Sequence, residues 1–446
     1  MPSRPTPDVG LTAPISAPPT LAQALVVWLK IGVLSFGGPA GQIALMHQQV
    51  IEQRKWLTES DFLRALSFCM VLPGPEAMQL ATYIGWRLHG VMGGLMAGLL
   101  FIIPGALVIL LLASGYVIYG EVPWVMAAFV GIKAAIVVIV VQALVRMARR
   151  SLSGWLAWLL ACGGFVGIFF FSLPFPLLVI IALIIGLVRP ISLASSVLSP
   201  GRSIAQSPTR TLVTAIIWLG LWWGPLALLI LAPQPVLWEI GVFFSQLAVV
   251  TFGGAYAVLT YLAQAAVFEY GWVSASAMMD GLGLAETTPG PLILVTQFIG
   301  FLAAHQVGGF DLALLASAVV LWATFMPCFL WIFVGAPYID WLTAKPRLKA
   351  GFDAIMAVVI GAMSNLMVWF ALHTFFQQTR AINWGPVQLW QVDQFNGIAV
   401  MITLLVVWLL FYRGWGVMRI LLIASVLAVL AYEPMVRGHV LSFIGA

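Results

Sequence analysis

The chain has 446 residues, of which 62% are hydrophobic and only 8% are charged, and its formal net charge is +5. Soluble domains carry about 25% charged residues, so the composition excludes a soluble protein and predicts an all-α polytopic membrane protein surrounded by the lipid bilayer. The 20 basic residues are spread thinly between apolar runs, which argues against nucleic acid as a partner. The three cysteines lie far apart within apolar stretches, and we predict neither a metal nor a cofactor.

Residues 1–20 contain six prolines and no apolar core, so they are expected to form a disordered tail rather than a cleaved signal peptide. About nine later stretches are apolar and long enough to span a membrane. They lie at roughly 91–118, 123–148, 153–171, 173–189, 209–231, 308–336, 350–376, 394–412 and 416–431.

Four further apolar pieces are interrupted by proline and glycine, at 21–36, 61–88, 236–268 and 273–304. Proline removes a backbone donor and clashes with the preceding turn, and glycine adds backbone freedom. Each piece is therefore expected to form two half-helices that meet at a tip. The first piece is short, and the sequence leaves open whether it is a full span or half of a hairpin.

The tips recur along the chain at a constant spacing. The motifs Phe36-Gly37-Gly38 and Pro73-Gly74-Pro75 reappear as Phe252-Gly253-Gly254 and Pro289-Gly290-Pro291, both displaced by the same distance along the sequence, and His305 follows His89 at that distance too. Lys133 and Asp353 correspond at a slightly larger offset. We predict an N-terminal repeat at 21–190, a linker at 191–234 with one spanning helix, and a C-terminal repeat at 235–446.

A single span in the linker would turn the second repeat over relative to the first. The expected fold is an all-α polytopic membrane protein with two inverted-topology repeats, broken or re-entrant helices and about 9–13 membrane segments. Basic residues favour the cytoplasmic side, and this threading places 15 of them on one side and two on the other.

The paired motifs resemble those of the chromate ion transporter family, in its long form with two domains. The matching residues are Phe36-Gly37-Gly38-Pro39, Leu72-Pro73-Gly74-Pro75-Glu76-Ala77, Thr251-Phe252-Gly253-Gly254 and Ala285-Glu286-Thr287-Thr288-Pro289-Gly290-Pro291. The resemblance implies two homologous halves of opposite topology in a bacterial inner membrane. It also implies secondary active export of chromate, which confers chromate resistance, with sulfate as a structural analogue of the substrate.

A tetrahedral dianion that enters a bilayer needs groups that replace its hydration, and the N-termini of half-helices offer unpaired N–H groups and a partial positive charge. The expected substrate-binding residues at the tips are Gly37, Gly38, Pro73, Gly74, Pro75, Gln79, Gly253, Gly254, Pro289, Gly290 and Pro291. The alternative interpretation is that the tips are kinks required only by packing.

Ionisable residues within apolar segments are functional candidates. Lys133 and Arg64 are expected to attract the anion, although Lys133 could instead pair with Asp353 or extend to an interface. Glu76 and Glu286 flank the tips, and either could carry a proton that is coupled to transport. The remaining candidates for coupling are Asp280, which corresponds to Arg64 in the repeat, and Asp353.

Four other functions are weighed against secondary transport. A membrane-embedded enzyme is disfavoured because no nucleophile or zinc motif occurs, and an ATP-driven pump because no P-loop occurs. A non-catalytic subunit would not need a duplicated set of broken helices, whereas a passive channel for an anion such as sulfate remains an alternative. The preferred oxyanion, the coupling ion and the formation of a homodimer are left open.

Overall fold

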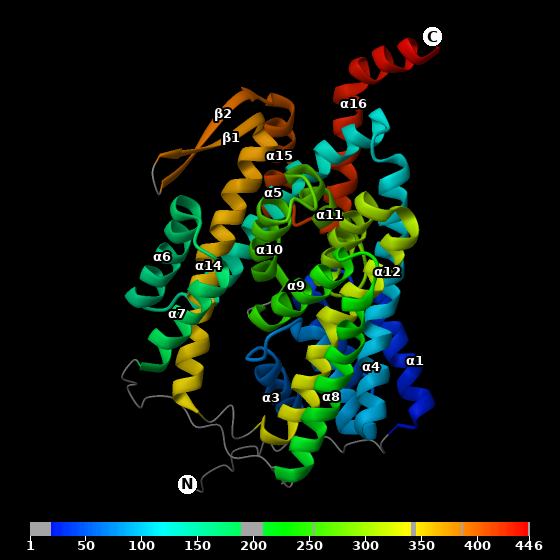
Figure 1. Cartoon of the computed structure of the whole chain (residues 1–446), viewed down its shortest axis with the longest axis vertical. Coiled ribbons are helices and arrows are strands. Elements are labelled where there is room, and N and C mark those ends of the chain that lie inside the picture. Colours follow the sequence, from blue (N-terminus) through cyan, green and yellow to red (C-terminus); the bar gives the residue numbers. More distant parts are fainter. Residues whose placement is uncertain (1–18, 189–207, 253–254, 340–344, 385–386, 445–446) are drawn as a thin grey trace, which may run out of the picture.

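The computed structural model describes residues 19–188, 208–252, 255–339, 345–384 and 387–444. The predicted tail and much of the predicted linker lie outside the described residues. Helices run mostly along the long axis of the molecule (Figure 1), and five of them are long and apolar enough to cross a membrane. The expected helical, polytopic membrane architecture is confirmed.

The first part of the chain forms the two broken pieces predicted there. Helix α1 (Leu21–Leu34) begins at Thr20, whose side chain caps it, and α2 (Gly38–His47) follows after the first tip. A π-helical turn, η1 (Gln48–Glu52), and helix α3 (Glu59–Cys69) come next. With 14 residues, α1 is shorter than the roughly 20 residues of a spanning helix.

Helix α4 (Glu76–Tyr119) consists of two antiparallel arms rather than one rod. The helical conformation breaks at His89 and Gly90, where Gly90 has φ 64°. The arms touch so closely that a Cβ atom at Gly85 would lie 2.3 Å from the carbonyl oxygen of Gly93. The arm after the turn is therefore the predicted span at 91–118, and the arm before it is a half-helix.

Helices α5 (Pro123–Ser151), α6 (Trp155–Phe171) and α7 (Phe175–Val188) complete the first repeat. Helix α8 (Pro208–Leu228), with the 3-10 turn η2 (Leu229–Leu231), occupies the predicted linker span. Helix α6 has 17 residues and the described part of α7 has 14, so both are shorter than the stretches expected at 153–171 and 173–189. Gly154 precedes α6, and the segment Ser172-Leu173-Pro174 separates the two helices.

The second repeat has the same order of elements. It contains α9 (Val236–Val250), α10 (Ala255–Ala263), the π-helical turn η3 (Gln264–Glu269), α11 (Ala275–Thr287), the 3-10 turn η4 (Leu292–Leu294), α12 (Val295–Gly335), η5 (Ala336–Tyr338) and α14 (Pro346–Phe375). An antiparallel hairpin of β1 (Phe376–Trp384) and β2 (Val387–Phe395) precedes α15 (Gly397–Phe411) and α16 (Val417–Ile444). The sequence analysis did not predict this hairpin, and α15 is again shorter than a spanning helix.

Local features of the two repeats correspond residue by residue. Both π-helical turns begin at equivalent positions, and each is followed by a left-handed residue, Lys55 or Gly271. The next helix is then capped by Thr58 in one repeat and by Ser274 in the other. Helix α12 also consists of two arms, which turn at Gly308 and Gly309.

The offset between the repeats changes after the second tip. Gly90 and Gly309 occupy the same left-handed position of the helical turn, so the turns correspond at a larger spacing than the tips do. The additional residues form η4, which separates Pro291 from α12, whereas α4 begins directly after Pro75. His89 and His305 are therefore not equivalent in the structure.

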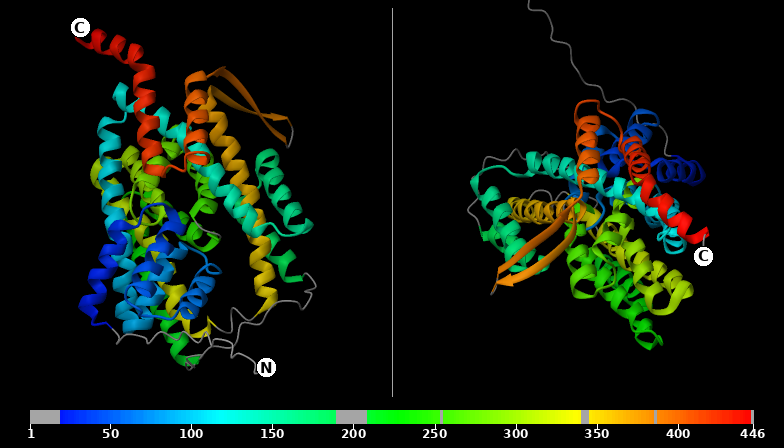
Figure 2. Two further views of the ribbon diagram at one scale, coloured as in Figure 1. Left: turned by 180° about the vertical axis from the view of Figure 1, so that it is seen from behind. Right: turned by 90° about the horizontal axis from the view of Figure 1, so that it is seen from above.

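The two repeats exchange their last helices. α6 and α7 pack against α14 of the second repeat, while α15 and α16 pack against α5 of the first. Figures 1 and 2 show α6 and α7 beside α14. Glycines allow the close approach: a Cβ at Gly131 would lie 2.0 Å from the Ala424 carbonyl oxygen, and one at Gly361 would lie 2.1 Å from that of Ala161. The repeats thus form one interlocked body.

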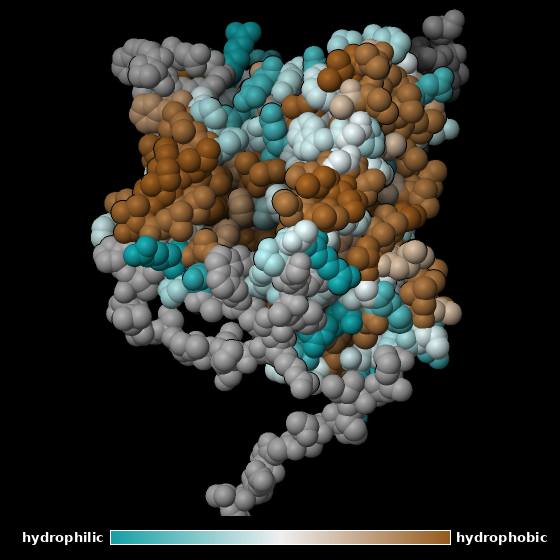
Figure 3. Space-filling model, turned by 60° about the horizontal axis from the view of Figure 1, so that its bottom comes forward, coloured by the Kyte–Doolittle hydropathy of each residue, from teal (hydrophilic) through white to brown (hydrophobic). Residues whose placement is uncertain are grey.

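The surface is apolar over large areas, as expected for a protein that lies in lipid. Hydrophobic residues cover much of the flank seen in Figure 3, and hydrophilic residues gather next to the grey segments at one end. The exposed apolar side chains include Trp155, Ile184, Leu228 and Met401. Single exposed apolar residues need no explanation, but a surface with this many indicates contact with lipid.

Candidate functional site

Hydrogen bonds join each proline–glycine–proline tip to the opposite repeat. The amide of Gly74 donates to the carbonyl oxygen of Thr251 at 2.7 Å, and the amide of Gly290 donates to that of Ser35 at 2.9 Å. Gly74 and Gly290 are equivalent in the repeat, as are Ser35 and Thr251, so the two bonds are counterparts of each other. These two tip amides are therefore engaged with protein and do not face a ligand.

The glycines are required by backbone conformation at these tips. Gly37, Gly74 and Gly290 have φ values of 86°, 122° and 91°, in the region that residues with a Cβ atom rarely adopt. Gly38, at φ 70°, starts α2 in the same way. Gly253 and Gly254 lie outside the described residues.

The N-termini of three helices meet at a small cavity between the tips. Its walls are Pro39 and Gln42 of α2, Pro75, Glu76 and Ala77 at the start of α4, and Pro291 and Leu292 at the start of η4. None of these three N-termini is capped by a side chain. Helix N-termini favour negative charge through free N–H groups and the helix dipole, whereas the carboxyl of Glu76 in the same wall opposes it when ionised.

The cavity is closed in this conformation. Its volume is about 10 Å³, which is roughly the room that one water molecule needs. A tetrahedral oxyanion is several times larger than water, so the helix N-termini must move apart to admit one.

Gln42 is a contributor that the sequence analysis missed. Its side chain is buried and its Nε2 donates to the carbonyl oxygen of Gly290 at 2.6 Å. The equivalent residue of the second repeat is Val258, which cannot form such a bond. The signal in the sequence was a glutamine one turn after Gly38 in an otherwise apolar helix.

Gln79 is buried beside the first tip. Its Nε2 donates to the carbonyl oxygen of Pro73 at 2.7 Å, and its Oε1 has no hydrogen-bond partner in the described part of the chain. Pro289 contacts the second arm of α4, since a Cβ at Gly105 would lie 2.1 Å from the Pro289 carbonyl oxygen. The predicted tip residues that are described thus gather around the cavity or brace it.

The two glutamates lie in different surroundings. Glu76 lines the cavity at the first turn of α4, where the helix dipole favours a negative charge. Glu286 is buried in α11 and accepts a hydrogen bond of 2.5 Å from the hydroxyl of Tyr256. The repeat equivalents are Val295, which starts α12 as Glu76 starts α4, and Met70 for Glu286, so neither carboxyl has a counterpart.

Lys133 pairs with Asp280, not with Asp353. Its Nζ lies 3.2 Å from Asp280 Oδ1 and also donates to the hydroxyl of Ser276, while the hydroxyl of Tyr116 donates to Asp280 Oδ2 at 2.9 Å. This cluster joins α4, α5 and α11 away from the closed cavity. Lys133 also faces cavities of about 370 and 480 Å³.

Arg64 and Asp353 lie in other places. Arg64 Nη2 donates to Asp61 Oδ1 at 2.7 Å on the same helix, and Arg87 lies 3.9 Å from the other oxygen of Asp61. Asp353 is exposed on α14. The structure therefore does not bring Arg64, Asp353 or Lys133 to the cavity between the tips.

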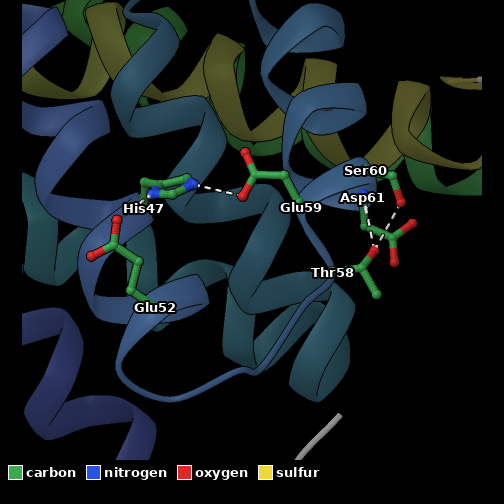
Figure 4. A network of polar contacts seen from close by, with 6 residues as sticks. All are labelled: His47, Glu52, Thr58, Glu59, Ser60 and Asp61. Carbon is green, nitrogen blue, oxygen red and sulfur yellow. Dashed lines mark hydrogen bonds and ion pairs between the residues drawn. The ribbon is translucent and has the colours of Figure 1, made fainter. Parts of the chain in front are cut away.

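A polar network ties the end of α2 to the start of α3 (Figure 4). His47 lies between two carboxylates, at 2.7 Å from Glu59 and 3.3 Å from Glu52. Thr58 accepts a hydrogen bond from the amide of Asp61 at 3.2 Å. The positions equivalent to His47, Glu59 and Asp61 are Ala263, Ala275 and Ala277, so this end of the first repeat is charged where the second repeat is apolar.

Comparison with known proteins gives matches along most of the chain. The sequence model of the family described as "Chromate transporter" matches residues 22–187 and 238–431. A "Probable chromate transport protein" of Synechococcus elongatus is 29% identical over 354 residues, which cover 78% of this chain and 84% of that protein.

Two further relatives carry similar names. The "Chromate transport protein" of Cupriavidus metallidurans is 29% identical over 378 residues, or 82% of this chain and 86% of the relative. The protein of the same name from Pseudomonas aeruginosa is 28% identical over 363 residues, or 78% and 81%. No solved structure matches the chain.

Proposed function

This chain belongs to the chromate transporter family, and we propose that it is a secondary active transporter that exports chromate across a bacterial inner membrane and so confers chromate resistance. The relatives are named as transport proteins, which supports transport of an oxyanion rather than enzymatic chemistry. The resemblance to the chromate ion transporter family is what favours export over import.

The observation that carries the proposal is the meeting of three uncapped helix N-termini at one cavity. Free amides at the starts of α2, α4 and η4 would replace the hydration of a tetrahedral dianion without any fixed cation. The glycines and prolines at Gly37, Gly38, Pro73, Gly74, Pro75, Pro289, Gly290 and Pro291 hold these N-termini in place, and Gln79 braces the first tip. Gly253 and Gly254 are proposed to do the same for the fourth tip.

A closed cavity fits a transporter better than a channel. Alternating access requires a state in which the binding site is sealed, whereas a channel needs a continuous path. A cavity of about 10 Å³ is compatible with such a sealed state. Sulfate has the same shape and charge as chromate, and we propose that it competes for the same amides.

Glu76 is the proposed site of proton coupling. An ionised carboxylate in the wall of the cavity would repel a bound dianion, so binding of the anion favours the protonated form. Release of the anion then favours release of the proton, which couples the two movements. Glu286, held by Tyr256 at 2.5 Å, is the second candidate because it too is a buried carboxyl in a half-helix.

The test uses membrane vesicles whose cytoplasmic face is outward, so that export appears as uptake. Radiolabelled chromate should accumulate in vesicles that contain the protein, and sulfate in excess should reduce the uptake. Collapse of the membrane potential should abolish accumulation, because a dianion that moves together with one proton still carries a net negative charge. Collapse of the pH gradient is tested separately. Equal uptake with and without any gradient would contradict active transport, and uptake that ignores sulfate would contradict a shared site.

A further inference from the structure

Lys133 belongs to a buried polar cluster that lines a large cavity. Lys133 of α5 pairs with Asp280 of α11 at 3.2 Å, and Tyr116 of α4 donates to the same carboxylate. The side chains of Lys133 and Asp280 are only 16% and 5% exposed. A cavity of about 480 Å³ reaches this cluster, with Glu121 and Gln306 also in its wall. The ion pair therefore forms the floor of a vestibule.

The repeat assigns a counterpart to each member of this pair. Asp280 corresponds to Arg64 at the spacing that separates the tips, and Lys133 corresponds to Asp353, since Gly131 and Gly351 start the matching segments. The counterpart of the pair Lys133–Asp280 is thus Asp353–Arg64. In each pair one residue lies on a short helix, α11 or α3, and the other lies on a long helix, α5 or α14. The charges are reversed between the two pairs, but each pair has one cation and one anion.

The counterpart pair is not made in this conformation. Arg64 holds Asp61 at 2.7 Å, and no cation of the described residues lies within 4.0 Å of Asp353. Helix α11 packs against α5 and α16, whereas α3 packs substantially only against α4 within the described ranges. Figure 1 and the left view of Figure 2 place α3 and the first turns of α14 in the lower part of the molecule.

We propose that Arg64 and Asp353 form the ion pair that closes the opposite entrance, and that the two pairs are made alternately during transport. The proposal rests on the proposed function, because only a transporter needs two gates that close in turn. In the alternate state Arg64 would exchange Asp61 for Asp353, α3 would pack against α14, and Lys133 would separate from Asp280.

Each opening then exposes one cation at the mouth that opens. Separation of Lys133 from Asp280 leaves the ammonium group in the vestibule of about 480 Å³, where it attracts an anion. Separation of Arg64 from Asp353 does the same at the other mouth. Because the charges are reversed between the pairs, each entrance has one basic group. It is Lys133 of α5 at one entrance and Arg64 of α3 at the other.

Cross-linking distinguishes the two states without measuring chromate. Cys69, Cys162 and Cys328 are first replaced by alanine, and two double variants are made: Lys133→Cys with Asp280→Cys, and Arg64→Cys with Asp353→Cys. A short bifunctional thiosulfonate should link both pairs in purified, reconstituted protein. In a variant that carries all four of these cysteines, linking of the first pair should lower linking of the second pair several-fold. If the first pair links and the second never does, with or without sulfate present, the alternate gate is refuted.

Transport gives the second readout. Asp353→Asn should lower chromate uptake about tenfold, the size expected when an ion pair biases a two-state equilibrium, while Asp311→Asn, an exposed carboxylate on α12, should leave it unchanged. Equal uptake by both variants would overturn the proposal even if a cross-link forms. If the parent takes up no chromate while both double variants cross-link as expected, the result would instead count against chromate as the substrate and leave the gates in place.

Discussion

Gly105→Ala tests whether the position of the second tip controls transport. Gly105 lies on the second arm of α4, and a Cβ atom there would lie 2.1 Å from the carbonyl oxygen of Pro289 and 2.7 Å from Leu294 Cδ1. Ordinary van der Waals contact begins at 3.4 Å, so the tip must retreat until the separation grows from 2.1 Å to near that distance. A backbone carbonyl cannot rotate away as a flexible side chain can.

The expected result is a large loss of transport with a modest loss of stability. Overpacking a well-packed site costs about 1–3 kcal/mol, which a large membrane protein tolerates. A displacement of about 1 Å in a site that depends on geometry lowers rates by about 100-fold. Chromate uptake into vesicles with the cytoplasmic face outward, normalised to the amount of protein, measures the effect.

Gly115→Ala is the matched control. It makes the same chemical change on the same helix, but no heavy atom lies within 4 Å of the added Cβ. Uptake should equal that of the parent, and alanine should favour the helix by about 1 kcal/mol. If Gly105→Ala transports as well as Gly115→Ala, the position of the Pro289 carbonyl does not control the site, and the assignment of the tips to substrate binding fails.

Three other substitutions test the same geometry. Gln42→Leu removes the donor that Gly290 accepts at 2.6 Å and should destabilise the purified protein by about 1–3 kcal/mol; an unchanged melting curve would contradict this. Glu76→Gln should make chromate uptake independent of pH, whereas Glu239→Gln, exposed on α9, should keep the pH profile of the parent. Gly85→Leu should prevent the arms of α4 from pairing, since even a Cβ would lie 2.3 Å from the backbone of the facing arm; recovery of normal amounts of folded protein from the membrane would disprove the tight turn.

The breaks in the helices were predictable because they arise from local chemistry. Proline and glycine act on their own turn of backbone, so the tips at Gly37, Gly74 and Gly290 follow from sequence alone. The expected ends of the long helices also lie within a few residues of those in the structure. The span expected at 123–148 runs to Ser151, and the one expected at 209–231 begins at Pro208. Apolar composition sets these lengths directly.

Contacts between distant segments could not be predicted in the same way. Nothing in the neighbourhood of Gly74 in the sequence indicates that its amide bonds to Thr251. Lys133 was expected to attract the anion, with a pair to its repeat equivalent or an extension to an interface as the alternatives. It pairs with Asp280 because α5 and α11 pack together. The repeat identifies equivalent residues, which need not touch.

The β1–β2 hairpin had a local signal that the search for spanning helices did not use. Residues 387–395 alternate polar and apolar side chains over part of their length, which is typical of a strand with one exposed face. The segment was treated only as the connection between two apolar stretches. Its hydrogen bonds with 376–384 are mutual, and the hairpin also packs on helices, with β1 against α14 and β2 against α6.

The crossed hydrogen bonds between the tips give a reason why the two repeats must move together. Gly74 of the first repeat is bonded to Thr251 of the second, and Gly290 of the second to Ser35 of the first. Enlarging a cavity of about 10 Å³ to hold an oxyanion requires the tips to separate, so it must lengthen one of these bonds. A buried amide that loses its acceptor costs about 1–3 kcal/mol, and the amides freed in this way can bind the oxygen atoms of the anion. Binding of the substrate thus offsets the opening of the tips, and the same step loosens the contact that holds one repeat against the other.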